Sequence, residues 1–346
     1  MPVNCVALRS LSLPVYMEPG NLGWRCILVS WLRTLPAGFD EKARKRVETL
    51  FDWLVPPCLR VVRAECAQYV PSSDSAMVHN LMDIFDSLVL DSGDTFTDPK
   101  KVEEIGLVRS VTLIESFFLF ALVWSIGASV DAEGRKKFDR FLREVCKEVN
   151  HYKLASQFPK KGLVHDYLFG REAGRWVHWS ETLSNSYRIP LESAFQEIIV
   201  PTIETARYKC LLDMTIKAKK PMLFVGPTGT GKSIYILDTL NGLNKDKCDQ
   251  IVINFSAQTS ANQTQALVDD KLDRRRRGVY GPTGGKMAVL FIDDLNVSAH
   301  TRSQHLRSLL LLCVLFLTVS PLFCIALSPF SRCPSARSTS LSLPSS

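Results

Sequence analysis

The segment GPTGTGKS at residues 226–233 limits the folds open to this chain more than any other feature. It fits the pattern GxxxxGK[ST] at every fixed position, between an apolar run at 222–225 and a helical run at 232–240. The glycines permit positive φ and carry no Cβ that would block an anion. The N–H groups of such a loop, with the N-terminus of the following helix, face phosphate oxygens. The segment therefore predicts a strand, a phosphate-binding loop and a helix, in that order.

Each residue of this loop has an expected role. Lys232 supplies a positive charge to the β- and γ-phosphates, and Ser233 supplies a hydroxyl to Mg²⁺. A glycine-rich turn before a helix can also be purely structural, but Lys232-Ser233 in register favours a nucleotide site. The other residues expected to bind the cofactor are Gly226, Pro227, Thr228, Gly229, Thr230 and Gly231.

Two carboxylates follow the apolar run at 288–292, which predicts a buried strand. In enzymes with this loop, an acid at such a strand end holds Mg²⁺, usually through water. We therefore expect Asp293 to be the metal residue and Asp294 to be the catalytic residue, placed as the general base for an attacking water. The alternative is a solvated Asp-Asp turn. Guanine recognition would need Asn-Lys-x-Asp, and Asn244-Lys-Asp-Lys is only a near match too close to the loop, so the sequence favours ATP over GTP.

Four arginines at 274–277 follow a helical run at 264–273. We interpret them as a solvated helix end that the helix dipole favours. The alternative is a phosphate-binding or arginine-finger role. The segment 278–286 is rich in Gly and Pro and predicts a hairpin or a loop.

The first half of the chain is predicted to be mainly helical. Pro56-Pro57 is expected to end one helix before a second begins at 59–68. Asp131 is expected to cap the last helix. Three charged residues, Glu104, Arg109 and Glu115, interrupt the most apolar segment, which therefore predicts a buried core helix rather than a membrane span. The expected helical segments are 40–70, 75–90, 102–130 and 131–149.

The second half alternates between strand and helix from a boundary near residue 185. Its strands are continuously apolar, which is typical of a parallel sheet covered on both faces. The fold class expected here is α/β, with a parallel sheet that follows a mainly helical region. The expected strands of this half are 222–225, 251–255 and 288–292, with a helix at 202–219. Two short strands, 162–170 and 174–182, are expected before the boundary.

Composition excludes several classes of protein. The net charge of +7 comes largely from residues 274–277 and from an end without acids after Asp294, so we expect no nucleic-acid partner. Ten cysteines without a CxxC pair, and six histidines without ligand spacing, predict reduced thiols rather than disulfides or zinc. The first residues lack the pattern of a signal peptide.

The segment 307–332 has no charged residue between its terminal arginines and is long enough to cross a bilayer. Pro321 and Pro329 interrupt it, and Ser- and Pro-rich sequence follows. The two interpretations are a membrane anchor and a non-native end from alternative splicing or intron read-through, of which we prefer the second. We expect residues 299–346 not to pack onto the α/β domain, although 306–317 is rich enough in leucine to form a helix.

Several segments together resemble axonemal dynein heavy chains. The loop with its flanks at 224–233, NFSAQTSANQTQ from 254, KLDRRR from 271 and FIDDLN from 291 are similar to the third AAA+ module of that family. Upstream, the segments VYMEP from 15, LGW from 22, DWLVPP from 52, VWSIG from 123 and WVHW from 176 resemble the end of the second module. The resemblance covers about residues 15–297. After DDLN the family usually continues with Met-Pro, whereas here Val297-Ser298 begins the uncharged tail.

The resemblance implies a P-loop AAA+ large domain, truncated, behind a lid-type helical region. It implies a divergent N-terminus at 1–14, the end of the second module at 15–184, the third module at 185–298 and a non-family tail at 299–346. It further implies ATP and Mg²⁺ as cofactors, a regulatory role in microtubule-based ciliary movement, and a place in the cytoplasm, cytoskeleton and axoneme. Implied partners are other heavy-chain modules, intermediate and light chains and, indirectly, microtubules, with no membrane.

Catalysis is expected to be weak in this chain alone. Family enzymes usually have Glu where Asp294 stands, and the sensor positions and neighbouring modules are not in this sequence. The alternatives are a non-catalytic truncated isoform that acts only as an assembly fragment, and a membrane-anchored P-loop protein.

Overall fold

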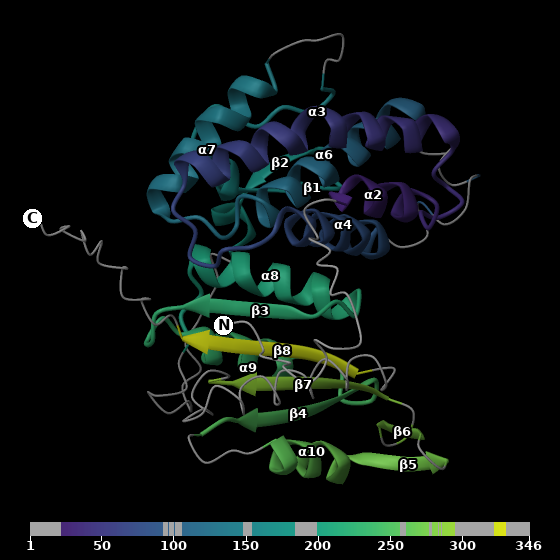
Figure 1. Ribbon diagram of the computed structural model, residues 1–346, viewed down its shortest axis with the longest axis vertical. Coiled ribbons are helices and arrows are strands. Elements are labelled where there is room, and N and C mark those ends of the chain that lie inside the picture. Colours follow the sequence, from purple (N-terminus) through teal and green to yellow (C-terminus); the bar gives the residue numbers. More distant parts are fainter. Residues whose placement is uncertain are drawn as a thin grey trace, which may run out of the picture. The chain divides into compact units, whose positions relative to one another are not determined.

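The computed structural model describes residues 22–92, 96, 100, 106–147, 154–183, 199–256, 261–276, 279–282, 284, 286–294 and 322–329. The chain divides into two compact units, Met1–Arg207 and Tyr208–Ser346. Figure 1 labels the elements of both units.

Unit 1 is mainly helical, as expected. Its one described hairpin pairs β1 (Tyr167–Gly170) with β2 (Arg175–His178) in antiparallel register, between the short 3₁₀ helices η3 (Val164–Asp166) and η4 (Trp179–Thr182). The helices described are α2 (Arg25–Leu32), α3 (Glu41–Glu65), α4 (Asp74–Asp91), α6 (Leu107–Ser125) and α7 (Ala132–Val145).

Helix α3 corrects one prediction. It runs without a break through Pro56 and Pro57, where we expected one helix to end and another to begin. Proline in a helix interior loses a backbone hydrogen bond and costs about 3 kcal/mol. The reason that α3 continues is tertiary packing, because its apolar stripe is buried on both sides of the prolines. That stripe comprises Val47, Leu50, Phe51, Leu54, Val55, Cys58, Leu59 and Val62.

Helix α6 is the buried core helix that its apolar sequence predicted. Its aromatic residues pack within unit 1; for example, the rings of Phe51 and Phe118 meet edge-on with centroids 5.0 Å apart. Glu115 is fully buried in this helix, where it accepts hydrogen bonds from Arg46 Nε (2.9 Å) and Ala155 N (2.6 Å). Among the described residues, no helix is long and apolar enough to cross a membrane.

Helix α7 begins as expected. The carboxylate of Asp131 accepts a hydrogen bond from Gly134 N (2.7 Å), which satisfies one of the unpaired N–H groups at the helix start. The helix ends at Val145, before the predicted limit of 149, and residues 148–150 lie outside the described range.

Unit 2 is built on a four-stranded parallel sheet in the order β3-β8-β7-β4, as Figure 1 shows. Helix α8 (Ile203–Lys217) begins in unit 1 and continues into unit 2, and α9 (Lys232–Asn241) and α10 (Ala261–Asp270) belong to unit 2. The strands are β3 (Met222–Gly226), β4 (Cys248–Asn254), β7 (Met287–Asp293) and β8 (Leu322–Pro329).

Strand β7 has buried apolar side chains on both faces of the sheet. Its alternate residues Val289 and Phe291 pack with α8 and α9, in a cluster that includes Leu212 and Ile236. The residues between them pack with β4 and α10 around Val268. Helices on opposite faces of an apolar parallel sheet confirm the α/β class expected from the continuous apolar strands.

The arginine-rich segment corrects a second prediction. Residues Leu272–Arg276 are not a helix end but strand β5, which pairs antiparallel with β6 (Val279–Pro282). The chain leaves α10 at Asp270 because Leu272 is buried in the cluster around Val268, and the hairpin partner then satisfies the backbone groups. Arg277 lies outside the described residues.

The tail corrects a third prediction. Residues 322–329 do pack onto the sheet, as β8, which lies in parallel register between β3 and β7. The physical reason is that LFCIALSP is an uncharged run with β-forming residues, and it satisfies the hydrogen-bonding edges of two parallel strands. Pro329 is the last residue of the strand, where proline is tolerated. The helix considered at 306–317 lies outside the described residues.

Candidate phosphate-binding site

The loop at 226–231 connects β3 to α9, as its sequence predicted. Gly229 has φ +83° and Gly231 has φ +77°, a left-handed conformation that residues with a Cβ seldom adopt. Gly231 is also the N-cap of α9, so the free N–H groups of the first helical turn begin there. The loop therefore ends with several N–H donors at the positive end of a helix dipole.

Lys232 lies across this loop. Its ammonium donates hydrogen bonds to the carbonyl oxygens of Gly226 (3.0 Å) and Pro227 (2.6 Å) and to Thr230 Oγ1 (3.2 Å). Thr230 Oγ1 in turn donates to Pro227 O (3.0 Å). These bonds fix the position of the charge without neutralising it, because every acceptor is an uncharged oxygen. The loop thus presents a held cation together with the N–H groups of the helix start.

Ser233 follows Lys232 as the second residue of α9 and is half-buried. Its hydroxyl is therefore attached to the first helical turn, at the same end as the loop. A hydroxyl oxygen in this place is a ligand type that Mg²⁺ accepts beside phosphate oxygens.

Asp293 ends β7 and is held by its backbone, because Phe255 N donates to Asp293 O (3.1 Å). Its Oδ1 accepts a hydrogen bond from Asp294 N (2.9 Å). Asp294 itself is exposed and has φ +52°, so the chain turns sharply there. The two carboxylates therefore differ: Asp293 is half-buried and fixed at the strand end, whereas Asp294 projects from a turn.

The sheet brings the loop and the carboxylates to one edge but not into direct contact. Strand β8 separates β3 from β7, and parallel strands lie about 4.8 Å apart, so the two strand ends are separated by about 10 Å. Residues this far apart would hold Mg²⁺ together with water molecules, which this ion usually keeps as ligands. Ser233 and Asp293 offer only oxygen donors and fit that ion. Within the described residues, no cluster of three or more His, Cys, Asp or Glu side chains forms another metal site.

Sequence reasoning did not identify Tyr235. A Cβ placed on Gly231 would lie 3.2 Å from Tyr235 Cζ and 3.3 Å from its hydroxyl oxygen, so this phenol stands against the loop. The signal was available, since residue 235 follows 231 by four positions and such residues share one helix face.

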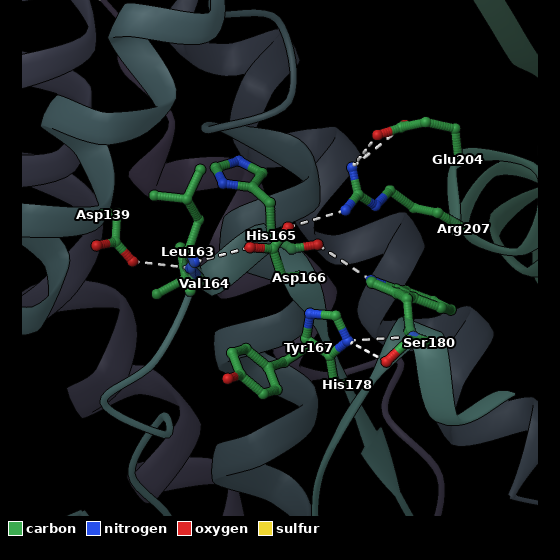
Figure 2. A network of polar contacts seen from close by, with 12 residues as sticks. Asp139, Leu163, Val164, His165, Asp166, Tyr167, His178, Ser180, Glu204 and Arg207 are labelled. Carbon is green, nitrogen blue, oxygen red and sulfur yellow. Dashed lines mark hydrogen bonds and ion pairs between the residues drawn. The ribbon is translucent and has the colours of Figure 1, made fainter. Parts of the chain in front are cut away.

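A second polar group, in unit 1, was also missed. Figure 2 shows the short turn at Leu163–Tyr167, where side chains from several elements converge. Asp166 accepts hydrogen bonds from Leu163 N (2.8 Å) and from Arg207 (2.9 Å), while Asp139 Oδ1 accepts one from Val164 N (2.7 Å). The charged side chains of this group are paired with one another. We therefore assign the group a role in stabilising the fold of unit 1.

His165 is buried at the centre of this turn. Its Nε2 lies 2.9 Å from the carbonyl oxygen of Gly127, and its own carbonyl accepts from Trp179 Nε1 (3.0 Å). Burial is the main cause that lowers the pKa of the His165 imidazole to about 4, and the nearby positive charge of Arg135 contributes to the same shift. The ring is therefore neutral at physiological pH, with the proton on Nε2 as a donor to Gly127 O.

Comparison with known proteins gives two family matches. Residues 187–312 match the family model described as "P-loop containing dynein motor region", and residues 47–181 match "Dynein heavy chain AAA lid domain". The chain belongs to the axonemal dynein heavy-chain family. The dynein motor-region match contains both the loop and Asp293-Asp294, and it extends past residue 297, where we expected the family resemblance to end. The dynein lid match lies within the helical unit.

Individual dynein relatives cover most of the chain. It is 41% identical over 294 residues to dynein axonemal heavy chain 12 of Mus musculus, which covers 82% of the chain and 9% of that relative. It is 38% identical over 297 residues to dynein axonemal heavy chain 3 of Homo sapiens, with 82% of the chain and 7% of the relative covered. The chain thus spans less than a tenth of the length of these dynein heavy chains.

Proposed function

We propose that this chain binds ATP with Mg²⁺ at the loop of residues 226–233, as the third AAA+ module of an axonemal dynein heavy chain. The observation that carries the proposal is the position of Lys232, whose ammonium is held by Gly226 O, Pro227 O and Thr230 at the N-terminus of α9. An uncompensated cation among free N–H groups is complementary to a polyphosphate.

The other residues of the site receive roles from their chemistry. Ser233 and Asp293 would hold Mg²⁺, Ser233 through its hydroxyl and Asp293 through water. When bound, Mg²⁺ would neutralise charge on the β- and γ-phosphates. Asp294 is the candidate base for an attacking water. Residues 185–298 are proposed as the module that contains the site, behind a lid region at 15–184.

Turnover is proposed to be near background in the isolated chain. Asp294 is exposed on a turn and its backbone N–H is used by Asp293, so nothing described fixes its carboxylate against a water. Phosphoryl transfer needs an oriented water and often an arginine from a partner, worth on the order of 10³-fold or more. Phosphate release by the whole chain should therefore match that of its Lys232→Ala variant, and a Lys232-dependent rate typical of AAA+ enzymes would contradict this.

The wider role follows from the relatives, whose names describe axonemal heavy chains. We propose that the chain serves microtubule-based ciliary movement in the cytoskeleton of the axoneme. Its partners would be other heavy-chain modules and the intermediate and light chains, and microtubules only indirectly.

Isothermal titration of the whole chain with Mg-ATP tests the proposal. Lys232→Ala should remove most of the binding, while Lys245→Ala, an exposed lysine outside the loop, should leave it unchanged. Equal affinities in wild type and Lys232→Ala would refute the site and leave the alternative, an assembly fragment without nucleotide.

A further inference from the structure

Tyr235 returns toward the phosphate loop from the first turn of α9. Its backbone N–H donates to Gly231 O (3.1 Å), so the two residues are joined by a regular helical hydrogen bond. Side chains on a helix lean toward its N-terminus and cover the residue four positions earlier. The phenol ring of Tyr235 therefore lies beside Gly231, the last residue of the loop.

The contact is close and involves the polar end of the ring. The position of a Cβ on Gly231 lies 3.2 Å from Tyr235 Cζ, 3.3 Å from its hydroxyl oxygen and 3.4 Å from Cε2. These three atoms form the outer end of the side chain, which carries the hydroxyl group. The hydroxyl is consequently held at the end of the loop where the first helical N–H groups begin.

The hydroxyl of Tyr235 is available for a ligand. The side chain is half-buried, and within the described part of the chain its hydroxyl makes no hydrogen bond. Lys232 Nζ, by contrast, is bound at the start of the loop, to Gly226 and Pro227. The loop therefore has a cation near one end and a free O–H donor at the other.

We propose that Tyr235 is a further nucleotide-contacting residue, whose hydroxyl donates a hydrogen bond to the phosphate chain of a nucleoside triphosphate. The inference rests on the proposed function of the loop. Phosphate oxygens accept hydrogen bonds and carry charge, so a neutral O–H donor beside the helix N-terminus suits them. Tyr235 thereby adds a side-chain donor to a site otherwise made of backbone N–H groups and Lys232.

Two ligands and three variants of the whole chain test the inference. Mg-ATP and Mg-tripolyphosphate share a phosphate chain, but only ATP has a sugar and a base. Tyr235→Phe keeps the ring on Gly231 and removes only the O–H, so it should weaken both ligands about tenfold, as expected for a hydrogen bond to a charged group. Tyr235→Leu, which removes the ring as well, should weaken them at least as much.

Tyr208→Phe is the matched control. Tyr208 packs edge-on against Phe224 of β3, with ring centroids 6.3 Å apart, so removal of its hydroxyl should not change the affinity for either ligand.

Unchanged binding by Tyr235→Phe with weaker binding by Tyr235→Leu would show that only the ring supports the loop, and would overturn the inference. Weaker binding of ATP alone would assign the hydroxyl to the sugar or base and overturn it too. A wild-type chain that binds neither ligand would refute the proposed function, and this inference with it.

Discussion

Arg207 donates a hydrogen bond to Asp166, 41 residues earlier in the chain, at 2.9 Å (Figure 2). Its guanidinium carbon also lies 5.8 Å from the ring centre of Trp124. Arg207 is almost completely buried, whereas Asp166 is partly exposed. The first turn of α8 is thereby fixed to the turn that carries His165.

Replacing Asp166 should destabilise unit 1. Asp166→Ala removes a partner of the buried Arg207 and the acceptor for Leu163 N, and should cost about 2 kcal/mol. Glu204→Gln removes the more exposed acid on the same guanidinium and should cost under about 1 kcal/mol. Urea denaturation followed by tryptophan fluorescence measures both. Similar midpoints for the two variants would show that the Asp166 contact has no special weight.

The buried His165 should make unit 1 sensitive to acid. Its folded pKa of about 4 lies below the ordinary 6.5, so the unfolded chain binds the proton first as pH falls. The contribution of His165 is complete above pH 6.5 and is lost as pH falls from 6.5 toward 4, by about 3 kcal/mol. The groups that face it include Arg135 and Arg207, which strengthen the shift, and Asp166, which opposes it.

A pair of histidine variants checks this pH dependence. His165→Asn should flatten the stability profile between pH 7 and 4 relative to wild type, whatever its effect at pH 7. His79→Asn should not, since His79 is largely exposed beside Asp83. Parallel profiles for wild type and His165→Asn would mean that the imidazole is protonated as easily in the folded state as in the unfolded one.

The two loop glycines should respond differently to alanine. Gly229→Ala adds a methyl group in open space, so its only cost is the strain of the left-handed backbone, about 1–2 kcal/mol of stability. Gly231→Ala adds the same strain and a mild clash with Tyr235, whose ring lies 3.2 Å from the new methyl and must move by a few tenths of an ångström. Thermal unfolding should therefore rank Gly231→Ala below Gly229→Ala. Adding Tyr235→Ala should restore part of the loss at 231 only; recovery at neither position would exclude the clash.

Removing β8 should destabilise unit 2. Truncation after residue 321 removes the strand between β3 and β7 and leaves both with unpaired backbone groups. Truncation after residue 329 keeps the strand and is the control. Hydrogen exchange should show loss of protection at 222–226 in the first variant but not in the second. Equal protection in both would show that β3 and β7 do not need this partner.

The features predicted correctly from sequence were those set by local pattern. The loop at 226–233 follows from its own residues, Asp131 caps its own helix, and the apolar runs of α6 and β7 predict that they are buried. The catalytic and binding roles assigned to the loop and to Asp294 stay predictions, because no ligand contact tests them.

The errors arose where distant residues decide the outcome. Pro56 and Pro57 are helix breakers by propensity, and only the packing of neighbours such as Leu54 and Leu59 keeps α3 continuous. Arg274 continues a helical pattern in the sequence. It lies instead in strand β5, where it pairs with Tyr280 of β6. Residues 322–329 looked like a detached tail, because their partners in β3 are about a hundred positions earlier.

The strand order β3-β8-β7-β4 also sets a schedule for folding during synthesis. Gly226 pairs in register with Pro329, so the ribosome must add roughly 100 residues before the strand that carries the phosphate loop gains its neighbour. At about 5–20 residues per second, this leaves β3 without a parallel partner for about 5–20 s. During that interval its unpaired backbone N–H and C=O groups are exposed to other nascent chains and to chaperones, while unit 1, complete by Arg207, can already have folded.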